Sequence, residues 1–287
     1  MQFTQYTDVA AFYNAAGDTL MRHEAQNIIS LGNVLIGVEG KDKTGWRDPA
    51  NWFMATVSDH SGILLTAIMT PPHNLALYAT NNQNNPQAIA CLIDGMAQEG
   101  APAPGVLAEK SLAEMFGPLY SARHSMTSKI NFSQRIYSLS EVNPAIPKGV
   151  VRLATERDMA FLPFWDDAFF SECKITPSNI SHDADKYRYH IRTNSLYIME
   201  DNGVPVSMAK INRKLKTVCS IGFVYTPPYF RNKGYATACV AAVSQMGLNR
   251  GFQSCILYTN LANPTSNSIY QKIGYRPICD SLEVKFE

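Results

Sequence analysis

One segment constrains the fold of this chain more than any other: an apolar strand that ends at two prolines and leads into a helix headed by a glycine. The run from Ile221 to Tyr225 predicts the strand, and Pro227 and Pro228 end it because proline cannot donate to a sheet ladder. A strand that leads into an amphipathic helix indicates an α/β domain. The helical apolar stripe that follows consists of Ala236, Cys239, Val240, Val243 and Met246.

The head of this predicted helix is suited to hold a phosphate. The first turn of a helix has backbone N–H groups without intrahelical partners and carries the positive end of the helix dipole. Gly234 and Ala236 are small enough to let a pyrophosphate approach the backbone, and Arg231 and Lys233 add positive charge. The patterns G-x-G-x-x-G and G-x-x-x-x-G-K-[ST] are absent, which argues against the two common nucleotide-binding loops.

Two motifs in the C-terminal half of the chain resemble the signatures of the GNAT superfamily of N-acetyltransferases. Pro228 and the run from Arg231 to Ala236 are similar to the main signature, a proline followed by R/Q-x-x-G-x-G/A. The segment from Asn263 to Tyr275 resembles the closing segment of the family, N-x-x-S-x-x-x-Y-x-K-x-G-Y/F. Both occur in the expected order, so the chain is identified as a member of this superfamily.

The resemblance implies acetyl-CoA as the acyl donor and no metal. Its pantetheine arm would pair with the backbone of Val224, Tyr225 and Thr226. Asn263 and Asn267 would contact the cofactor, although Asn263 is equally suited to cap a helix that starts at Pro264. The pyrophosphate would lie on the backbone amides of Arg231, Asn232, Lys233, Gly234, Tyr235, Ala236 and Thr237.

Tyr270 is the predicted catalytic residue. Attack of an amine on the thioester expels a thiolate, and a phenol with a pKa of about 10 can protonate that thiolate while staying neutral at working pH. The alternative is that Tyr270 is a packing residue like Tyr275. The general base stays unassigned among four carboxylates, Asp166, Asp167, Glu172 and Glu200. The aromatic run Phe161 to Phe170 either lines an acceptor site or belongs to the core.

The chain also divides into two halves. Its 287 residues exceed the usual size of one domain, about 100 to 150 residues. Strand and helix patterns alternate, stop in the proline-containing segment from Glu141 to Gly149, and restart at Val150. Thr70-Pro71-Pro72 echoes Thr226-Pro227-Pro228, which favours duplication of one fold, unless T-P-P is only a good strand terminator.

The first half lacks the phosphate loop. After Thr70-Pro71-Pro72 the sequence runs His73-Asn74-Leu75-Ala76-Leu77, without an arginine, a glycine or a small-residue helix start. We therefore predict an α/β fold with mixed (α+β) sheets and two GNAT-like acyl-CoA N-acyltransferase domains. Residues 1–143 form the degenerate domain in this prediction, and residues 149–287 form the domain that binds acetyl-CoA.

Composition limits the partners. A formal charge of +1 gives no basic cluster for nucleic acid or an anionic membrane. The six cysteines are far apart, without a C-x-x-C pair, which argues against a metal site or disulfide framework and fits a reducing compartment. Without an apolar stretch of about 20 residues or a signal-like start, we expect a cytoplasmic protein without a membrane partner. The oligomeric state stays open.

The predicted function is acetyl transfer from acetyl-CoA to a primary amine of a small molecule or peptide. Two alternatives stay open on the sequence alone: a regulatory protein that binds acyl-CoA without transfer, and a transferase with a longer acyl donor.

Overall fold

The computed structural model describes residues 1–40, 48–80, 85–144, 148–173 and 184–287. Within these ranges the chain forms two compact units. The first comprises Met1–Ile136 with Tyr258–Asn263 and Pro277–Glu287, and the second comprises Tyr137–Leu257 with Pro264–Arg276. Each unit therefore includes chain from both halves of the sequence.

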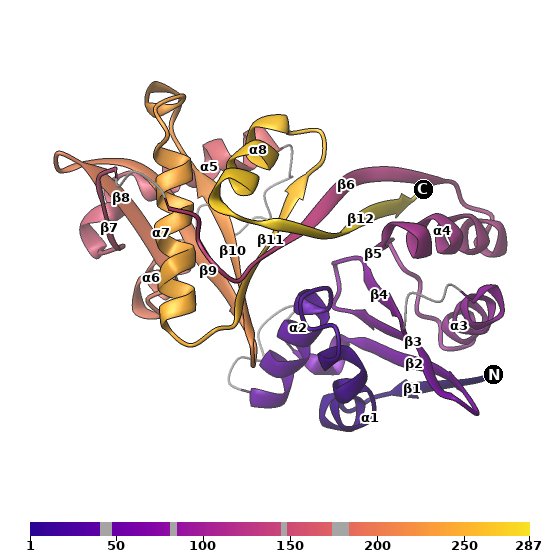
Figure 1. Ribbon diagram of the computed structural model, residues 1–287. Helices are drawn as coiled ribbons and strands as arrows, with labels where there is room; N and C mark the ends of the chain where they lie inside the picture. The colour runs from indigo at the N-terminus through magenta and orange to yellow at the C-terminus, as the bar shows by residue number, and fades with distance from the viewer. Residues whose placement is uncertain (41–47, 81–84, 145–147, 174–183) are drawn as a thin grey trace. The chain divides into compact units, whose positions relative to one another are not determined.

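The first unit is a mixed sheet with helices on both of its faces (Figure 1). Its strand order is β1-β2-β3-β4-β5-β12-β6, so the last strand of the chain lies antiparallel beside β5. The elements are β1 (Gln2–Tyr6), α1 (Val9–Met21), α2 (Ile28–Glu39), η2 (Pro49–Asn51), β2 (Phe53–Asp59), β3 (Gly62–Met69), β4 (Leu75–Ala79), α3 (Pro86–Gln98), β5 (Gly105–Glu109), α4 (Lys110–His124), most of β6 (Ser128–Leu139) and most of β12 (Arg276–Phe286).

The second unit repeats this plan. Its strands follow the order β7-β8-β9-β10-β11, and the end of β6, from the first half of the chain, lies next to β11. The elements are β7 (Val150–Leu153), η4 (Glu156–Ala160), α5 (Leu162–Cys173), α6 (Ala184–Arg192), β8 (Leu196–Asp201), β9 (Val204–Lys214), β10 (Val218–Tyr225), η5 (Pro228–Phe230), α7 (Tyr235–Asn249), β11 (Ser254–Asn260) and α8 (Pro264–Ile273).

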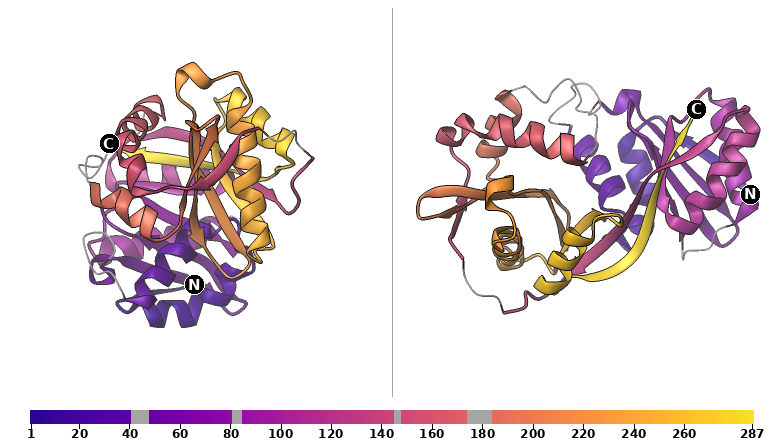
Figure 2. Two further views of the ribbon diagram at one scale, coloured as in Figure 1. Left: turned by 90° about the vertical axis from the view of Figure 1, so that its left-hand side faces the viewer. Right: turned by 90° about the horizontal axis from the view of Figure 1, so that it is seen from above.

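Alternation along the central strands explains the layers of the second unit. Tyr197 and Met199 belong to the core that α7 and α8 cover, whereas Leu196 and Ile198 belong to the core with α5 and α6. Successive strand residues point to opposite faces, so a strand buried on both faces needs apolar residues at every position. Figure 2 shows α5 on one face of these strands and α7 on the other.

The two halves of the sequence have the same element order, β-α-α-β-β-β-α-β-α-β, from β1 to β6 and from β7 to β12, with α1 matching α5 and α3 matching α7. This repetition confirms the predicted α/β class with two copies of one fold. The T-P-P echo, however, does not mark equivalent places. Thr70-Pro71-Pro72 lies between β3 and β4, whereas Thr226-Pro227-Pro228 lies between β10 and α7. Proline can end any strand because it cannot donate to the sheet ladder. The repeated T-P-P therefore marks two strand ends and does not align one copy of the fold with the other.

The counterpart of the phosphate loop in the first unit is therefore the segment between β4 and α3. Its described ends are Thr80 and Asn85. Residues His73 to Leu77, which follow Thr70-Pro71-Pro72, instead lead into β4.

A buried ion-pair network holds the start of the second unit together. Asp158 is 1% exposed and accepts hydrogen bonds from both terminal nitrogens of Arg152, each at 2.7 Å, and from the Thr155 backbone N–H at 2.7 Å. Burial alone would raise the pKa of Asp158, but these hydrogen bonds hold that pKa below its usual value. Arg152 also donates to Glu200 at 2.6 Å.

We expect Asp158→Asn to lower the free energy of unfolding by about 2 to 4 kcal/mol at pH 7, because Arg152 then lacks its buried counter-charge. A carboxylate with a depressed pKa stabilises the fold above its unfolded pKa of about 3.9, and this contribution is lost as pH falls through the folded pKa. The difference between wild type and variant, measured by urea unfolding, should therefore shrink below pH 4.

Asp185→Asn, at an exposed ion pair with Arg188, is the control and should change stability by less than about 0.5 kcal/mol. A similar small change at Asp158 would contradict the role of the network.

Candidate functional site

Strand β10 pairs with its parallel neighbour β11 only over its first residues. Parallel pairing with β11 runs from Val218 to Ser220, while β10 continues to Tyr225. The register with β9 shifts between Gly222 and Tyr225, and Phe223 in this bulge has a φ of 55°. The strand end that was predicted to pair with pantetheine therefore lies beyond the described pairing with β11.

Two of the three residues predicted to contact pantetheine have backbone carbonyls that accept hydrogen bonds from side chains of the protein. Ser207 Oγ donates to the carbonyl of Tyr225 at 3.0 Å, and Arg231 Nε donates to the carbonyl of Thr226 at 2.8 Å. Val224, the third of these residues, is half-buried. These contacts fix the position of the strand end from the side of β9 and of the loop that follows.

The head of α7 is open to a ligand. Gly234 precedes the helix with a φ of 82°, in the left-handed region that favours glycine, and no side chain caps the first turn. A Cβ added at Gly234 would have no atom within 4 Å. The predicted pyrophosphate contacts Tyr235, Ala236 and Thr237 form the first turn, so their N–H groups meet the requirements for an anion site.

The matching helix head in the first unit is closed. The side chain of Asn85 accepts from the N–H groups of Gln87 at 2.9 Å and Ala88 at 3.2 Å, and Pro86 at the first helical position has no N–H. The orphan donors that would hold a phosphate on α3 are therefore satisfied by the protein itself.

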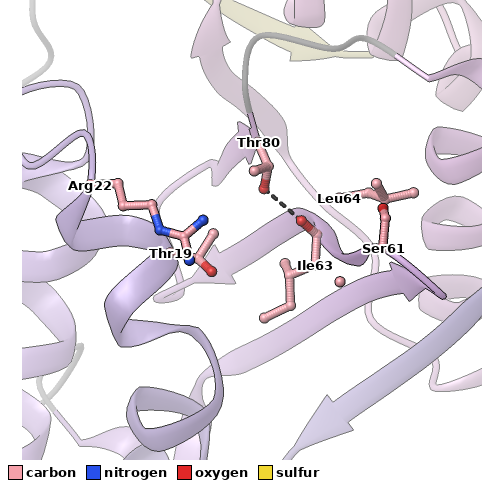
Figure 3. Close-up of a pocket in the computed structure, with 7 residues that line it drawn as sticks. Thr19, Arg22, Ser61, Ile63, Leu64 and Thr80 are labelled. Atoms are coloured by element: carbon pink, nitrogen blue, oxygen red, sulfur yellow. Dashed lines mark hydrogen bonds between the residues drawn. The ribbon is translucent and has the colours of Figure 1, made fainter.

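A hollow of about 260 Å³ does lie at the end of β4 in this first unit. Figure 3 shows Thr80, whose hydroxyl donates to the carbonyl of Ile63 at 2.7 Å, together with Thr19 from α1 and Arg22 at the C-terminal cap of α1. The hollow lacks a glycine-headed helix, so it does not repeat the geometry at α7.

The loop before α7 is braced by its own cations. Arg231 forms an ion pair with Glu172 through two contacts of 2.7 and 2.8 Å. Lys233 Nζ lies 4.7 Å from the ring centroid of Tyr229, and Asn232 adopts a φ of 61°. Arg231 thus ties the loop to α5, whereas the ammonium of Lys233 lies over the ring of Tyr229.

Tyr270 lies in the core of the second unit, 8% exposed, on α8. Burial raises the pKa of its phenol to about 12, with a smaller contribution from the nearby Cys173. Its ring lies 6.4 Å from that of Tyr137 and 6.0 Å from that of Tyr275. The phenol therefore stays protonated across the physiological pH range, as an acid must.

The two predicted asparagine contacts differ in setting. Asn267 accepts a hydrogen bond of 3.0 Å from the hydroxyl of Tyr137. Asn263 is exposed and directly precedes α8, and its own N–H donates to the carbonyl of Asn260 at 3.0 Å. Tyr137 was not singled out in the sequence, because a tyrosine in a strand of the other half carries no local signal for this contact.

Three of the four candidate bases form ion pairs with lysine or arginine side chains of the protein. Asp166 is fully buried, and both of its oxygens accept from Lys186, at 3.0 and 2.9 Å. Glu172 pairs with Arg231, and Glu200 pairs with Arg152. Lys186 Nζ also lies 4.8 Å from the ring of Phe170. The ammonium of Lys186 therefore lies beside the aromatic side chains of α5. The sequence alone did not reveal this contact.

Comparisons with known proteins agree with this geometry. Residues 162–275 match the family model described as the acetyltransferase (GNAT) family. A GCN5-related N-acetyltransferase from Sphaerobacter thermophilus aligns at a TM-score of 0.65 and 14% identity, over 99% of this chain and 95% of that chain. A GNAT-family acetyltransferase from Colwellia psychrerythraea aligns at 0.58 and 11%, over 100% and 99%.

A tandem GNAT protein from the clavulanic acid biosynthesis pathway aligns at a TM-score of 0.56 and 10% identity, over 100% of this chain and 98% of that chain. Identities this low show the fold alone. A comparison with curated proteins finds no match.

The family model assigns residues 162–275 to the acetyltransferase (GNAT) family, and the chain as a whole has two copies of the fold. The recognition made from the two sequence motifs is confirmed. Among the described residues, no cluster of three or more His, Cys, Asp or Glu could hold a metal ion. Within the same ranges no helix has the length and hydropathy needed to cross a membrane.

Proposed function

We propose that the protein is an acetyl-CoA-dependent N-acetyltransferase that acts on a primary amine of a small molecule or peptide. The observation that carries this proposal is the uncapped, glycine-headed α7 directly after the bulged end of β10. Backbone amides from Arg231 to Thr237 would bind the pyrophosphate, and the end of β10 would align the pantetheine arm. The cytoplasm is the proposed location.

In the proposed reaction the neutral amine attacks the thioester carbonyl carbon, the C–S bond breaks, and the thiolate receives a proton, while the attacking nitrogen loses a proton that restores the proton donor. Tyr270 is the proposed donor of that proton. Its pKa of about 12 keeps the hydroxyl protonated, and burial also raises the pKa of the neighbouring Cys173 thiol. Burial in the same surroundings would also raise the pKa of the released thiol. The proton can therefore still pass from Tyr270 to the thiolate.

We expect one acetyl-CoA to bind per chain, because the head of α7 is open and the head of α3 is capped by Asn85. Isothermal titration of the full-length protein should give a stoichiometry of one. The full chain is needed, since residues 1–143 alone lack β12, which completes the sheet of the first unit. Two equivalent sites would contradict the proposal that the first copy is degenerate.

The activity itself is tested by incubating the protein with acetyl-CoA and a panel of amines and measuring free thiol. Amine-dependent thiol release supports the transferase. Tight binding without release from any amine would favour a regulatory acyl-CoA-binding protein, and release only from longer acyl-CoA thioesters would change the donor.

A further inference from the structure

The two copies of the fold agree at the strand end beside the hollow of the first unit. Thr80 directly follows β4, and Thr226 directly follows the matching strand β10. Each hydroxyl bonds to the preceding strand: Thr80 Oγ1 donates to the carbonyl of Ile63 in β3, and Thr226 Oγ1 lies 2.8 Å from Ser207 Oγ in β9. The hollow therefore lies at the place in the first copy where a strand end is proposed to align a ligand in the second.

The charge at the end of the first helix differs between the copies. In the second copy Glu172, near the C-terminal end of α5, forms an ion pair of 2.7 Å with Arg231. In the first copy Arg22 stands at the C-terminal cap of the matching helix α1 and lines the hollow. Within the described part of the chain Arg22 forms no ion pair. A guanidinium thus replaces a carboxylate at this helix end, which suits the first copy to an anion.

The other polar side chains around the hollow are mostly engaged. Asp59, the acid of the β2–β3 hairpin, accepts from Ser61 Oγ at 2.6 Å and from the Ser61 backbone N–H at 2.8 Å. These hydrogen bonds hold the pKa of the Asp59 carboxyl below its usual value, and they occupy the hydroxyl proton of Ser61. The proton of Thr80 is donated to Ile63. Arg22 and Thr19 are therefore the lining side chains with donors left for a ligand.

The lining matches a small carboxylate with an apolar tail. Figure 3 shows Arg22 and Thr19 on one side of the hollow and Leu64 on the other. A guanidinium binds a carboxylate through two parallel N–H bonds, and the half-buried Ile63 and Leu64 offer apolar surface to a short alkyl chain. The volume of about 260 Å³ is below the range of about 300 to 1,000 Å³ that is usual for larger ligands. A molecule of few atoms is the expected occupant.

We propose that the hollow at the end of β4 binds a small carboxylate with a short alkyl tail. Arg22 holds the carboxylate, and the Thr19 hydroxyl donates one further hydrogen bond to it. Ile63 and Leu64 contact the tail. The first copy of the fold, in which Asn85 caps the helix head, thus has a ligand of its own that carries no phosphate.

Three probes test this site in an NMR titration of the full-length protein, followed by the backbone amides of the residues that line the hollow. Butyrate has the proposed chemistry, n-butylamine has the same tail with the opposite charge, and inorganic phosphate is an anion without a tail. A ligand of so few atoms is expected to bind with a Kd on the order of 1 mM. Butyrate should reach this affinity, and the other two probes should bind at least about tenfold more weakly.

Two variants remove the proposed contacts. Arg22→Met should weaken butyrate about tenfold or more, and Arg22→Lys should recover part of the loss, because an ammonium keeps the charge without the two parallel bonds. Thr19→Val keeps the shape of the side chain and should weaken butyrate a few-fold. Arg123→Met, at an exposed arginine of α4 that pairs with Asp94, is the matched control and should bind butyrate normally. The amide spectrum of each variant shows whether it is folded.

Three results would overturn the proposal. The first is no response of these amides to butyrate at millimolar concentrations, or an equal response to n-butylamine or phosphate. The second is unchanged butyrate binding in folded Arg22→Met, because Arg22 would then only interact with the dipole of α1. The third is loss of butyrate binding in Gly234→Trp, which would place the ligand at the proposed donor site of the second unit. Acetyl-CoA binding is not needed for any of these tests, so failure of the proposed function would be seen separately.

Discussion

Tyr270→Phe is expected to lower kcat by about 10² to 10⁴-fold while the Kd for acetyl-CoA hardly changes. The substitution keeps the ring, which packs beside Tyr137 and Tyr275, and removes the proton proposed for the departing thiolate. The measurement is steady-state turnover with an amine that the panel identifies, together with titration calorimetry for the donor.

The pH dependence of turnover sharpens this test. Because burial raises the pKa of Tyr270 to about 12, the protonated form prevails below that pH. Loss of this proton should therefore not produce a falling alkaline limb between pH 8 and 10 in the wild type. A fall in that range would show that another group with a lower pKa serves as the acid.

Tyr275→Phe is the matched control. Tyr275 is also buried, and its hydroxyl contacts Ser244 Oγ at 2.8 Å. Losing that hydrogen bond should cost about 1 kcal/mol of stability and leave kcat within a few-fold. If both phenylalanine variants retain near-normal turnover, the sulfur leaves without help from Tyr270.

Gly234→Trp is expected to abolish binding of acetyl-CoA while the fold persists. The space beside Gly234 is open, so the indole would fit there and occupy the place proposed for the pyrophosphate. The positive φ of 82° adds a conformational cost of about 1 to 2 kcal/mol for any residue with a Cβ. Titration calorimetry measures the binding, and circular dichroism checks that helix content is kept.

Two controls separate blocking from strain. Gly234→Ala carries the same conformational cost with a minimal side chain, and should weaken binding far less. Gly251→Trp places the same side chain at a glycine with a φ of 94° and open surroundings, just beyond the C-terminal end of α7. It should bind acetyl-CoA normally. An unchanged Kd in folded Gly234→Trp would remove the assignment of the phosphate loop.

Local patterns in the sequence determine much of this protein. The apolar stripe from Ala236 to Met246 predicts a helix, and α7 spans Tyr235–Asn249. Pro86, a residue type that suits the first turn of a helix, begins α3, which ends at Gln98. These elements follow from side-chain periodicity, prolines and glycines, which act over a few residues and are visible in one dimension. The GNAT motifs are equally local, which is why the superfamily is recognisable from them.

The tertiary structure decided which distant parts meet. Nothing in the sequence of β12 shows that it pairs with β5, because the alternation of side chains along a strand does not identify the neighbouring strand. The motif shows Arg231 as a cation for phosphate, but only the fold places Glu172 where it pairs with that arginine. Lys186 in the aromatic cluster and Asn85 as the cap of α3 were likewise invisible. Charge pairing and capping depend on distances in space between side chains, and those distances exist only once the helices and strands have packed.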